Sequence, residues 1–230
     1  MAQLMEQLME QYTPNLFYYL DEFVVSIKET LIMLFASGIL SFIFGIILGT
    51  ILVVTREGNI LENNFINNII ATIVNVFRSI PFVILITLLI PLTRIIMGTF
   101  IGVKGAIFPL VMGCVPFFTR QVDLALSSVD KGVIEAAQSM GLSPLEIIFR
   151  VYLRESIPDI ARATTITAIS LLGLTAMGGA VGGGGLGAFV IRYGHNRHFT
   201  DITYVSVILI LIFVTIIQFT GNRVIKKTTH

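Results

Sequence analysis

Residues 130–160 read DKGVIEAAQSMGLSPLEIIFRVYLRESIPDI, a stretch too polar to span a membrane in a chain otherwise dominated by apolar runs. Asp130 has a side chain suited to capping a helix N-terminus. Four apolar residues then follow at the i, i+3, i+4 and i+7 spacing of one helical face: Val133, Ala136, Ala137 and Met140. Gly141 comes where a left-handed glycine commonly ends a helix. The sequence therefore predicts a short amphipathic helix that ends at Gly141.

A second helix is predicted directly after this turn. Ser143 and Glu146 have the spacing of a capping box, with Pro144 at the first helical position. The apolar face of this helix is predicted to consist of Leu145, Ile148, Phe149 and Tyr152. Ser156 and Asp159 repeat the capping spacing and open the next apolar run. The apolar faces of the two helices need a cover, which is either a partner protein or lipid headgroups.

Five apolar runs flank this stretch, and each is long enough to cross a bilayer, which takes about 20 mostly apolar residues in a helix. They cover residues 27–54, 66–92, 105–126, 157–181 and 202–224. The chain is 55% hydrophobic and 13% charged, with a mean hydropathy of +0.89, whereas soluble domains carry about 25% charged residues. Because lipid offers the backbone no hydrogen-bond partners, each run must be helical. We expect an all-α integral membrane protein.

Loop charges predict that the N-terminus lies outside the cell and the C-terminus inside. With the N-terminus outside, nine lysines and arginines lie on the inner side and five on the outer side, and the basic tail after the last run gives the clearest signal. Residues 27–224 are predicted to form one domain, with a basic cytoplasmic tail at 225–230. Residues 1–26 are predicted to be an interfacial segment, in which four residues share an apolar helical face: Leu4, Met5, Leu8 and Met9.

Small residues recur at four-residue spacing in the first apolar run. They are Ser37, Ser41, Gly45 and Gly49. Such a stripe lets another helix backbone approach closely. We therefore expect it to be a packing surface.

The polar stretch carries a family signature. Glu135-Ala136-Ala137, followed three residues later by Gly141, resembles the EAA-xxx-G motif of ABC importer permeases, although Arg154 stands where that family has a proline. The resemblance implies a type I importer permease fold in the cell membrane. It also implies that residues 130–156, the coupling-helix region, dock into a cytoplasmic ATPase subunit. The residues that it assigns to coupling are Glu135, Ala136, Ala137, Met140, Gly141 and Ser143.

Other segments are similar to methionine-importer permeases, namely residues 75–83, 90–94, 176–188 and 217–221. This similarity implies a homodimer, two ATPase subunits, an extracytoplasmic substrate-binding lipoprotein, and L- or D-methionine as substrate. It further implies that this chain is not an enzyme and holds no cofactor, because ATP and magnesium are bound by the partner ATPase. A permease for another amino acid or a small osmolyte stays open as an alternative.

Several polar or small residues within the apolar runs are candidates for the translocation path or its gate. Arg78 is the most conspicuous, since a charge within a membrane is costly and is a functional hypothesis by default. The full set is Asn75, Arg78, Pro81, Thr167, Ser170, Thr175, Gly178 and Gly179. Each also has a structural interpretation. Arg78 could reach the interface, the hydroxyls could bond their own helices, and the glycines could form a tightly packed helix break.

Other function classes are disfavoured. Gly182, Gly184 and Gly187 fit G-x-G-x-x-G, but they follow an apolar run rather than a strand, and no Walker-type lysine follows them. Cys114 is a lone cysteine, and His195 and His198 have no evident further ligand, so no metal site is expected. An ion-coupled secondary transporter usually holds acidic residues in mid-membrane, and none of the five runs does.

Overall fold

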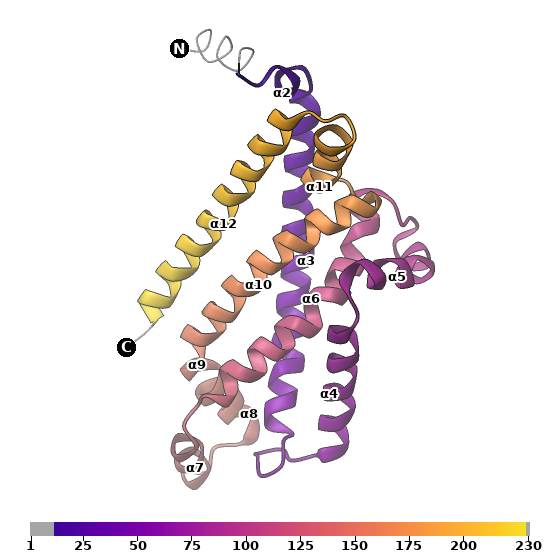
Figure 1. Ribbon diagram of the computed structural model, residues 1–230. Coiled ribbons are helices and arrows are strands. Elements are labelled where there is room, and N and C mark those ends of the chain that lie inside the picture. The colour runs from indigo at the N-terminus through magenta and orange to yellow at the C-terminus, as the bar shows by residue number, and fades with distance from the viewer. Residues whose placement is uncertain (1–11, 229–230) are drawn as a thin grey trace. The chain divides into compact units, whose positions relative to one another are not determined.

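The computed structural model describes residues 12–228, and within this range every regular element is helical (Figure 1). The predicted apolar face formed by Leu4, Met5, Leu8 and Met9 lies outside the described residues, as do the last two residues of the tail. In chain order the elements are α2 (Pro14–Tyr18), α3 (Leu20–Val54), α4 (Asn64–Ser79), α5 (Phe82–Met97), α6 (Gly102–Ser127), α7 (Lys131–Ser139), α8 (Pro144–Ile147), π-helical η1 (Ile148–Tyr152), α9 (Leu153–Glu155), α10 (Ile157–Gly178), π-helical η2 (Gly179–Gly183), α11 (Gly185–Phe189), π-helical η3 (Val190–His195) and α12 (Thr200–Thr228).

Four helical stretches in the described range are long and apolar enough to cross a membrane. They are Leu20–Val54, Gly102–Ser127, Ile157–Gly183 and Thr200–Thr228. The number becomes five if α4 and α5 count as one broken span. The all-helical membrane architecture expected from the sequence is therefore confirmed.

The prediction of one helix covering residues 66–92 is wrong. α4 ends at Ser79, Ile80 is extended (φ −85°, ψ 121°), and α5 begins at Phe82. Pro81 explains the break, because a proline lacks an N–H donor and pushes the preceding residue out of the helical region. Hydropathy does not indicate this break, because the residues on both sides of Pro81 are apolar.

The chain divides into two compact units. Among the described residues, unit 1 comprises 12–37, 82–110 and 170–216, and unit 2 comprises 38–81, 111–169 and 217–228. Helices α3, α6, α10 and α12 each contribute residues to both units.

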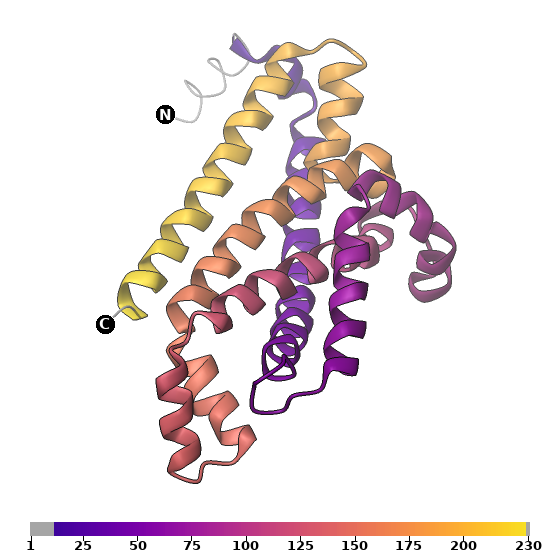
Figure 2. The same ribbon diagram turned by 60° about the horizontal axis from the view of Figure 1, so that its bottom comes forward.

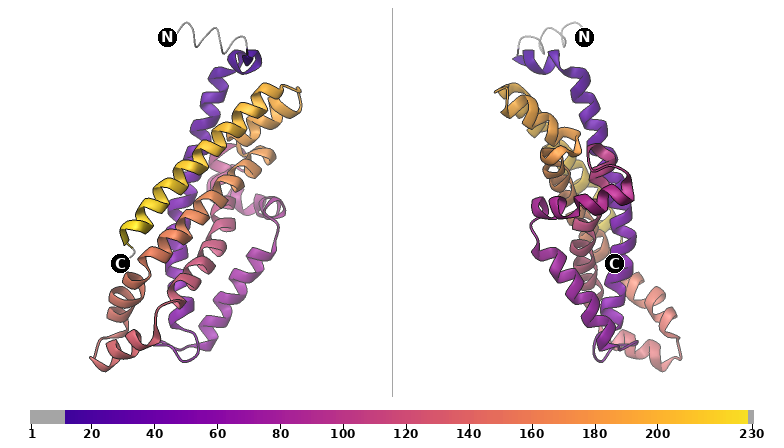
Figure 3. Two further views of the ribbon diagram at one scale, coloured as in Figure 1. Left: turned by 60° about the vertical axis from the view of Figure 1, so that its left-hand side comes forward. Right: turned by 90° about the vertical axis from the view of Figure 1, so that its right-hand side faces the viewer.

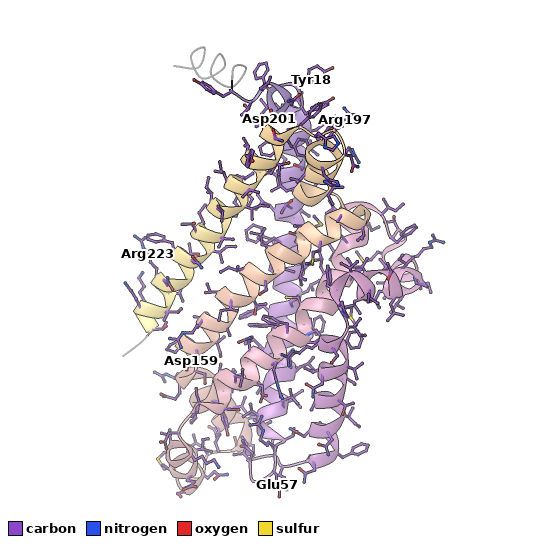
Figure 4. All side chains as sticks on the ribbon, in the orientation of Figure 1. Tyr18, Glu57, Asp159, Arg197, Asp201 and Arg223 are labelled. Atoms are coloured by element: carbon purple, nitrogen blue, oxygen red, sulfur yellow. The ribbon has the colours of Figure 1, made fainter. Side chains whose placement is uncertain are left out.

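Unit 1 is built around an aromatic-rich core, whose buried members are Leu16, Phe23, Leu186, Phe189, Tyr193 and Ile202. Asp201, in the first turn of α12, holds α2 against this core. Its carboxylate accepts hydrogen bonds from the backbone N–H groups of Asn15 (3.0 Å) and Leu16 (3.2 Å). Figure 4 shows Asp201 close to Tyr18 at the α2 end of the unit. An acidic side chain from another element thus satisfies donors that the start of α2 leaves open.

Unit 2 depends on a close approach of α3 to α6. A Cβ atom added at Gly45 would lie 2.4 Å from the Phe118 ring, and one at Gly49 would lie 2.9 Å from the Thr119 carbonyl oxygen. Only glycine fits there, since real Cβ atoms keep larger separations. The prediction that this stripe is a packing surface is confirmed, with Ser41 also buried.

We expect Gly49→Val to destabilise the fold by about 1–3 kcal/mol, the usual cost of overpacking a close contact. The Thr119 carbonyl cannot give way without distorting α6. The measurement is the midpoint of thermal unfolding in detergent. Gly173→Ala is the matched control, because no atom lies within 4 Å of the added Cβ. An unchanged midpoint for Gly49→Val would contradict the close approach.

Candidate functional site

Helix α7 forms where the sequence predicts it. The Asp130 side chain caps its N-terminus by accepting a hydrogen bond from the backbone N–H of Gly132 (2.6 Å). Gly141 follows the C-cap with a φ of +80°, and its N–H bonds the carbonyl of Gln138 (2.9 Å). Both predicted ends of the helix are confirmed.

The buried face of α7 differs from the predicted one. Ile134 and Ala137 are buried, whereas Val133, Ala136 and Met140 are exposed. Of the four residues in the predicted face, only Ala137 turns inward. Ile134 and Ala137 also have helical spacing, and both pack into the core cluster that contains Val53 and Leu126. Val133 and Met140 are thereby left on the outer surface.

The capping box that starts α8 is formed. The Ser143 hydroxyl accepts from the N–H of Glu146 (3.4 Å), and the Glu146 carboxylate accepts from the N–H of Ser143 (3.0 Å). The Ser143 hydroxyl also donates to the Glu146 carboxylate (2.9 Å). The hydrogen bonds that the Ser143 N–H and hydroxyl donate lower the pKa of Glu146, because they favour its charged form. The turn between α7 and α8 is therefore fixed by a glycine on one side and a reciprocal cap on the other.

The face predicted for the second helix is half wrong. Ile148 and Tyr152 are buried as expected, but Leu145 and Phe149 are exposed, and Ile147 and Val151 are buried in their place. The four buried residues keep ordinary helical spacing, so the inward face is rotated from the predicted one toward the core that contains Val53 and Leu126. Figure 2 shows the short helices after the turn running back alongside α7.

The coupling-helix region therefore presents apolar side chains to solvent on both of its helices. The exposed fractions are 46% for Val133, 72% for Met140, 65% for Leu145 and 66% for Phe149. Four other predicted coupling residues, Glu135, Ala136, Gly141 and Ser143, are also exposed. Large apolar groups gathered on a polar segment mark a surface that another molecule covers.

The opposite side of this region is anchored in the core of unit 2. Ile134, Ala137, Ile147 and Val151 join a cluster that includes Val53, Val54 and Leu126. Tyr152 is 2% exposed, and its hydroxyl donates a hydrogen bond to the Asn59 side-chain carbonyl (2.8 Å). The exposed apolar surface of Val133, Met140, Leu145 and Phe149 is thus backed by a well-packed base.

The predicted capping box at Ser156 and Asp159 does not form. The Ser156 hydroxyl donates to the Ala125 carbonyl (3.1 Å), and the Ser156 N–H bonds the Tyr152 carbonyl instead of the Asp159 carboxylate. Asp159 pairs with Arg162 at 2.7 Å. Since α9 leads almost directly into α10, Ser156 lies at a short interruption between two helices and does not begin an isolated one.

Helix α4 has a continuous polar face. At 100° per residue its polar side chains fall in one arc, and those that the structure leaves exposed are Asn64, Asn68, Thr72, Asn75, Arg78 and Ser79. Pro81, just beyond the helix end, is exposed as well. Sequence reasoning singled out Asn75 and Arg78 but missed Asn68, Thr72 and Ser79, although their helical spacing was present in the sequence. Lipid is a poor environment for such a face.

The candidate residues on α10 are in different environments. Thr167 and Thr175 are buried, and their hydroxyls bond carbonyls of their own helix, those of Ala163 (2.8 Å) and Leu172 (2.7 Å). Ser170 is exposed. In this conformation the two threonines contribute to helix packing, and Ser170 is the hydroxyl that a permeating molecule could reach.

The glycine run in unit 1 is a tightly packed helix break. A Cβ atom at Gly179 would lie 2.6 Å from the backbone of Ala188, and Gly178 is buried beside it. Gly184 and Gly185 have φ values of +82° and +71°. The carboxylate of Glu29 accepts from the N–H of Gly185 (2.6 Å) and so holds the start of α11. The sequence alone did not indicate this contact, which joins positions 156 residues apart.

The family described as "binding-protein-dependent transport system inner membrane component" matches residues 41–225. The chain belongs to this family. It is 46% identical to a D-methionine transport system permease protein MetI of Yersinia pestis over 202 residues, which are 88% of this chain and 93% of the relative. It is also 46% identical to the methionine import system permease protein MetP of Bacillus subtilis over 174 residues, 76% of this chain and 78% of the relative.

A solved structure of the MetNI methionine ABC transporter in inward-facing conformations contains a similar chain. The TM-score is 0.90 at 42% sequence identity, with 92% of this chain and 98% of that chain covered. The predicted type I importer permease fold is therefore confirmed. This permease is a multi-pass component of the cell membrane that serves transport and is not an enzyme, as the sequence analysis predicted.

Proposed function

We propose that this permease moves methionine into the cell, powered by a separate ATPase that binds the coupling-helix region. The observation that carries the proposal is the exposed apolar surface of Val133, Met140, Leu145 and Phe149 on a segment whose fold is otherwise fixed by caps and a packed base. The substrate is supported by the methionine named for both relatives and for the solved transporter.

The ATPase is the occupant that the chemistry of this surface favours. An apolar surface flanked by the exposed polar groups of Glu135 and Ser143 is typical of a protein interface, with an apolar centre and a polar rim. ATP and magnesium would be bound by the ATPase, and this chain would supply contacts that differ between its two conformational states. The assembly we propose contains two copies of this permease, two ATPase subunits and an extracytoplasmic binding lipoprotein.

The polar face of α4 is proposed to line the translocation path between the two copies. A zwitterionic amino acid needs polar groups along its route, and the exposed amides and hydroxyls of Asn68, Thr72 and Asn75 supply them. Arg78 is proposed to interact there with the substrate carboxylate, with Pro81 setting where the helix ends. Ser170 is retained as a path residue. Thr167, Thr175, Gly178 and Gly179 would shape the gate through packing.

We expect Asn75→Leu and Arg78→Ala each to lower methionine uptake about tenfold or more, since each removes a polar partner worth roughly 1.5–3 kcal/mol when charged groups are involved. Uptake of radiolabelled methionine into proteoliposomes measures the effect. Ile73→Leu, on the apolar side of the same helix, is the control. If Asn75→Leu and Arg78→Ala were both expressed normally and both took up methionine at the wild-type rate, the polar face of α4 would serve packing and not the translocation path.

The function itself is tested by reconstituting the permease with its ATPase and binding protein. Methionine presented by the binding protein should stimulate ATP turnover and enter the vesicles. If a different amino acid or an osmolyte stimulated ATP turnover and methionine did not, the proposed substrate would be wrong but the ATP-driven mechanism would stand. Uptake driven by an ion gradient without ATPase would overturn the proposal.

A further inference from the structure

The inner side of the coupling-helix region faces the first cytoplasmic loop, residues 55–63, across a hollow. A cavity of about 260 Å³ lies there, lined by Glu57 and Asn59 from the loop and by Lys131, Glu135 and Gln138 from α7. Figure 3 shows this loop between α3 and α4 at the end of unit 2 where α7 lies, and Figure 4 marks Glu57 there. The two segments are therefore not pressed together over their whole facing surfaces.

Tyr152 bridges the two segments beside this hollow. Its ring lies in the apolar core, and its hydroxyl reaches the Asn59 side chain at 2.8 Å. Within residues 12–228, this is the one side-chain hydrogen bond between residues 131–155 and the loop. Burial raises the pKa of Tyr152, so its hydroxyl remains a neutral donor at cellular pH.

Asn59 is held in a loop that is tied to both neighbouring helices. Its side-chain oxygen also accepts from the N–H of Ile60 (2.7 Å). The N–H of Leu61 bonds the Val54 carbonyl at the end of α3 (2.9 Å), and the N–H of Asn63 bonds the Thr55 carbonyl (2.9 Å). These hydrogen bonds hold the loop in place, so we expect a displacement of Asn59 to move the rest of the loop with it.

The same loop starts α4. The Asn63 side chain caps that helix by accepting from the N–H of Ile66 (3.1 Å). The Asn67 amide, one turn further on, donates to the Leu52 carbonyl of α3 (2.6 Å). Hydrogen bonds joined by short stretches of backbone therefore lead from Tyr152, through the loop, to the first turn of the helix that carries the polar face.

We propose that Tyr152 and Asn59 form a positioning pair that transmits movement of the docked coupling-helix region to α4. The inference rests on the proposed function, because it needs an ATPase to move the region and a path that α4 lines. The loop takes one arrangement in each state of the transporter, and the hydrogen bond between Tyr152 and Asn59 favours one of these two arrangements. The cavity gives the loop room to change place.

A purely structural role predicts a different result. Removing one hydroxyl from a packed tyrosine would then lower stability, and uptake and ATP turnover would fall together in proportion to the folded protein. A positioning role changes the ratio of methionine imported to ATP hydrolysed while leaving the folded fraction intact. The ratio is therefore the quantity to measure.

The experiment compares Tyr152→Phe, Asn59→Ala and the double variant in proteoliposomes containing the ATPase and the binding protein. We expect each single variant to lower the methionine-to-ATP ratio about fivefold, the factor expected from one neutral hydrogen bond. The double variant should be no worse than Asn59→Ala alone, since Asn59→Ala already removes the hydrogen bond that Tyr152→Phe breaks. Asn59→Asp, which keeps the acceptor, should restore most of the ratio. Tyr204→Phe, on the exposed face of α12, is the matched control.

The outcomes separate the inference from the function on which it rests. Gly141→Pro, which breaks the turn between α7 and α8, serves as the reference variant. If it uncouples ATP hydrolysis from methionine uptake while Tyr152→Phe keeps the wild-type ratio, the positioning pair is rejected and the proposed function stands. If the double variant multiplies the two single effects, the residues do not act as a pair and the inference also falls. If the wild-type assembly shows no ATP-dependent uptake, the proposed function fails and takes the inference with it.

Discussion

Phe149→Asp is expected to abolish ATP-driven methionine uptake while leaving the permease folded in the membrane. Phe149 is 66% exposed in this chain, so its replacement costs little in the fold itself. In the assembly, burial of a phenylalanine contributes about 1.5–3 kcal/mol, and a buried carboxylate without a partner adds a further penalty. The ATPase should therefore bind about 10- to 150-fold more weakly or worse.

Co-purification of the ATPase with the permease, followed by uptake assays, measures this effect. Phe149→Leu is the matched control, because it keeps an apolar side chain at the same position and should retain binding. Full ATPase binding and uptake by Phe149→Asp would show that the exposed apolar surface is not where the ATPase docks.

Gly141→Pro is expected to give the second large loss. Gly141 has a φ of +80°, whereas proline is fixed near −65°, and the substitution also removes the N–H that bonds Gln138. The cost is about 3 kcal/mol or more, which is enough to displace α8 relative to α7. The ATPase should continue to hydrolyse ATP, but hydrolysis should no longer drive uptake.

Gly141→Asn controls for the conformation, since asparagine tolerates left-handed backbone and should preserve much of the transport. Glu135→Lys tests the same helix without changing its backbone and should also uncouple transport. Simultaneous measurement of ATP turnover and uptake distinguishes uncoupling from loss of assembly. Coupled transport by Gly141→Pro at the wild-type level would refute the role assigned to this turn.

The turns and caps of the coupling-helix region were predictable from the sequence. Asp130, Gly141 and the Ser143–Glu146 pair act through hydrogen bonds and backbone preferences that reach only a few residues along the chain. Such local rules hold wherever the surroundings do not override them. At Ser156 the surroundings do override the local rule. The Ser156 hydroxyl donates to the distant Ala125 carbonyl, and the predicted capping box does not form.

The buried faces were less predictable because they depend on residues far apart in the sequence. Phe149 is exposed and Val151 is buried because this side of the helix packs into a core that includes the distant Val53 and Val54. The partnership of Tyr152 with Asn59 joins positions 93 residues apart. Pro81 was visible, but hydropathy alone continued the helix through it.

The candidate path shows the same division. The polar periodicity of α4 could have been found by placing residues 64–79 on a helical wheel. Attention to the charge within the apolar run picked out only Arg78 and the nearby Asn75, both toward the C-terminal end of the helix. The link between Glu29 and the glycine run needed the folded chain.

A photocrosslinking residue introduced at Met140 or Phe149 tests the central claim most directly. In membranes containing the whole transporter, the account predicts a covalent adduct between each position and the ATPase. The same probe at Ile134, which is buried inside this chain, should give no such adduct. Adducts with lipid alone at both exposed positions would contradict the account, because the coupling-helix region would then lie on the membrane surface with no ATPase against it.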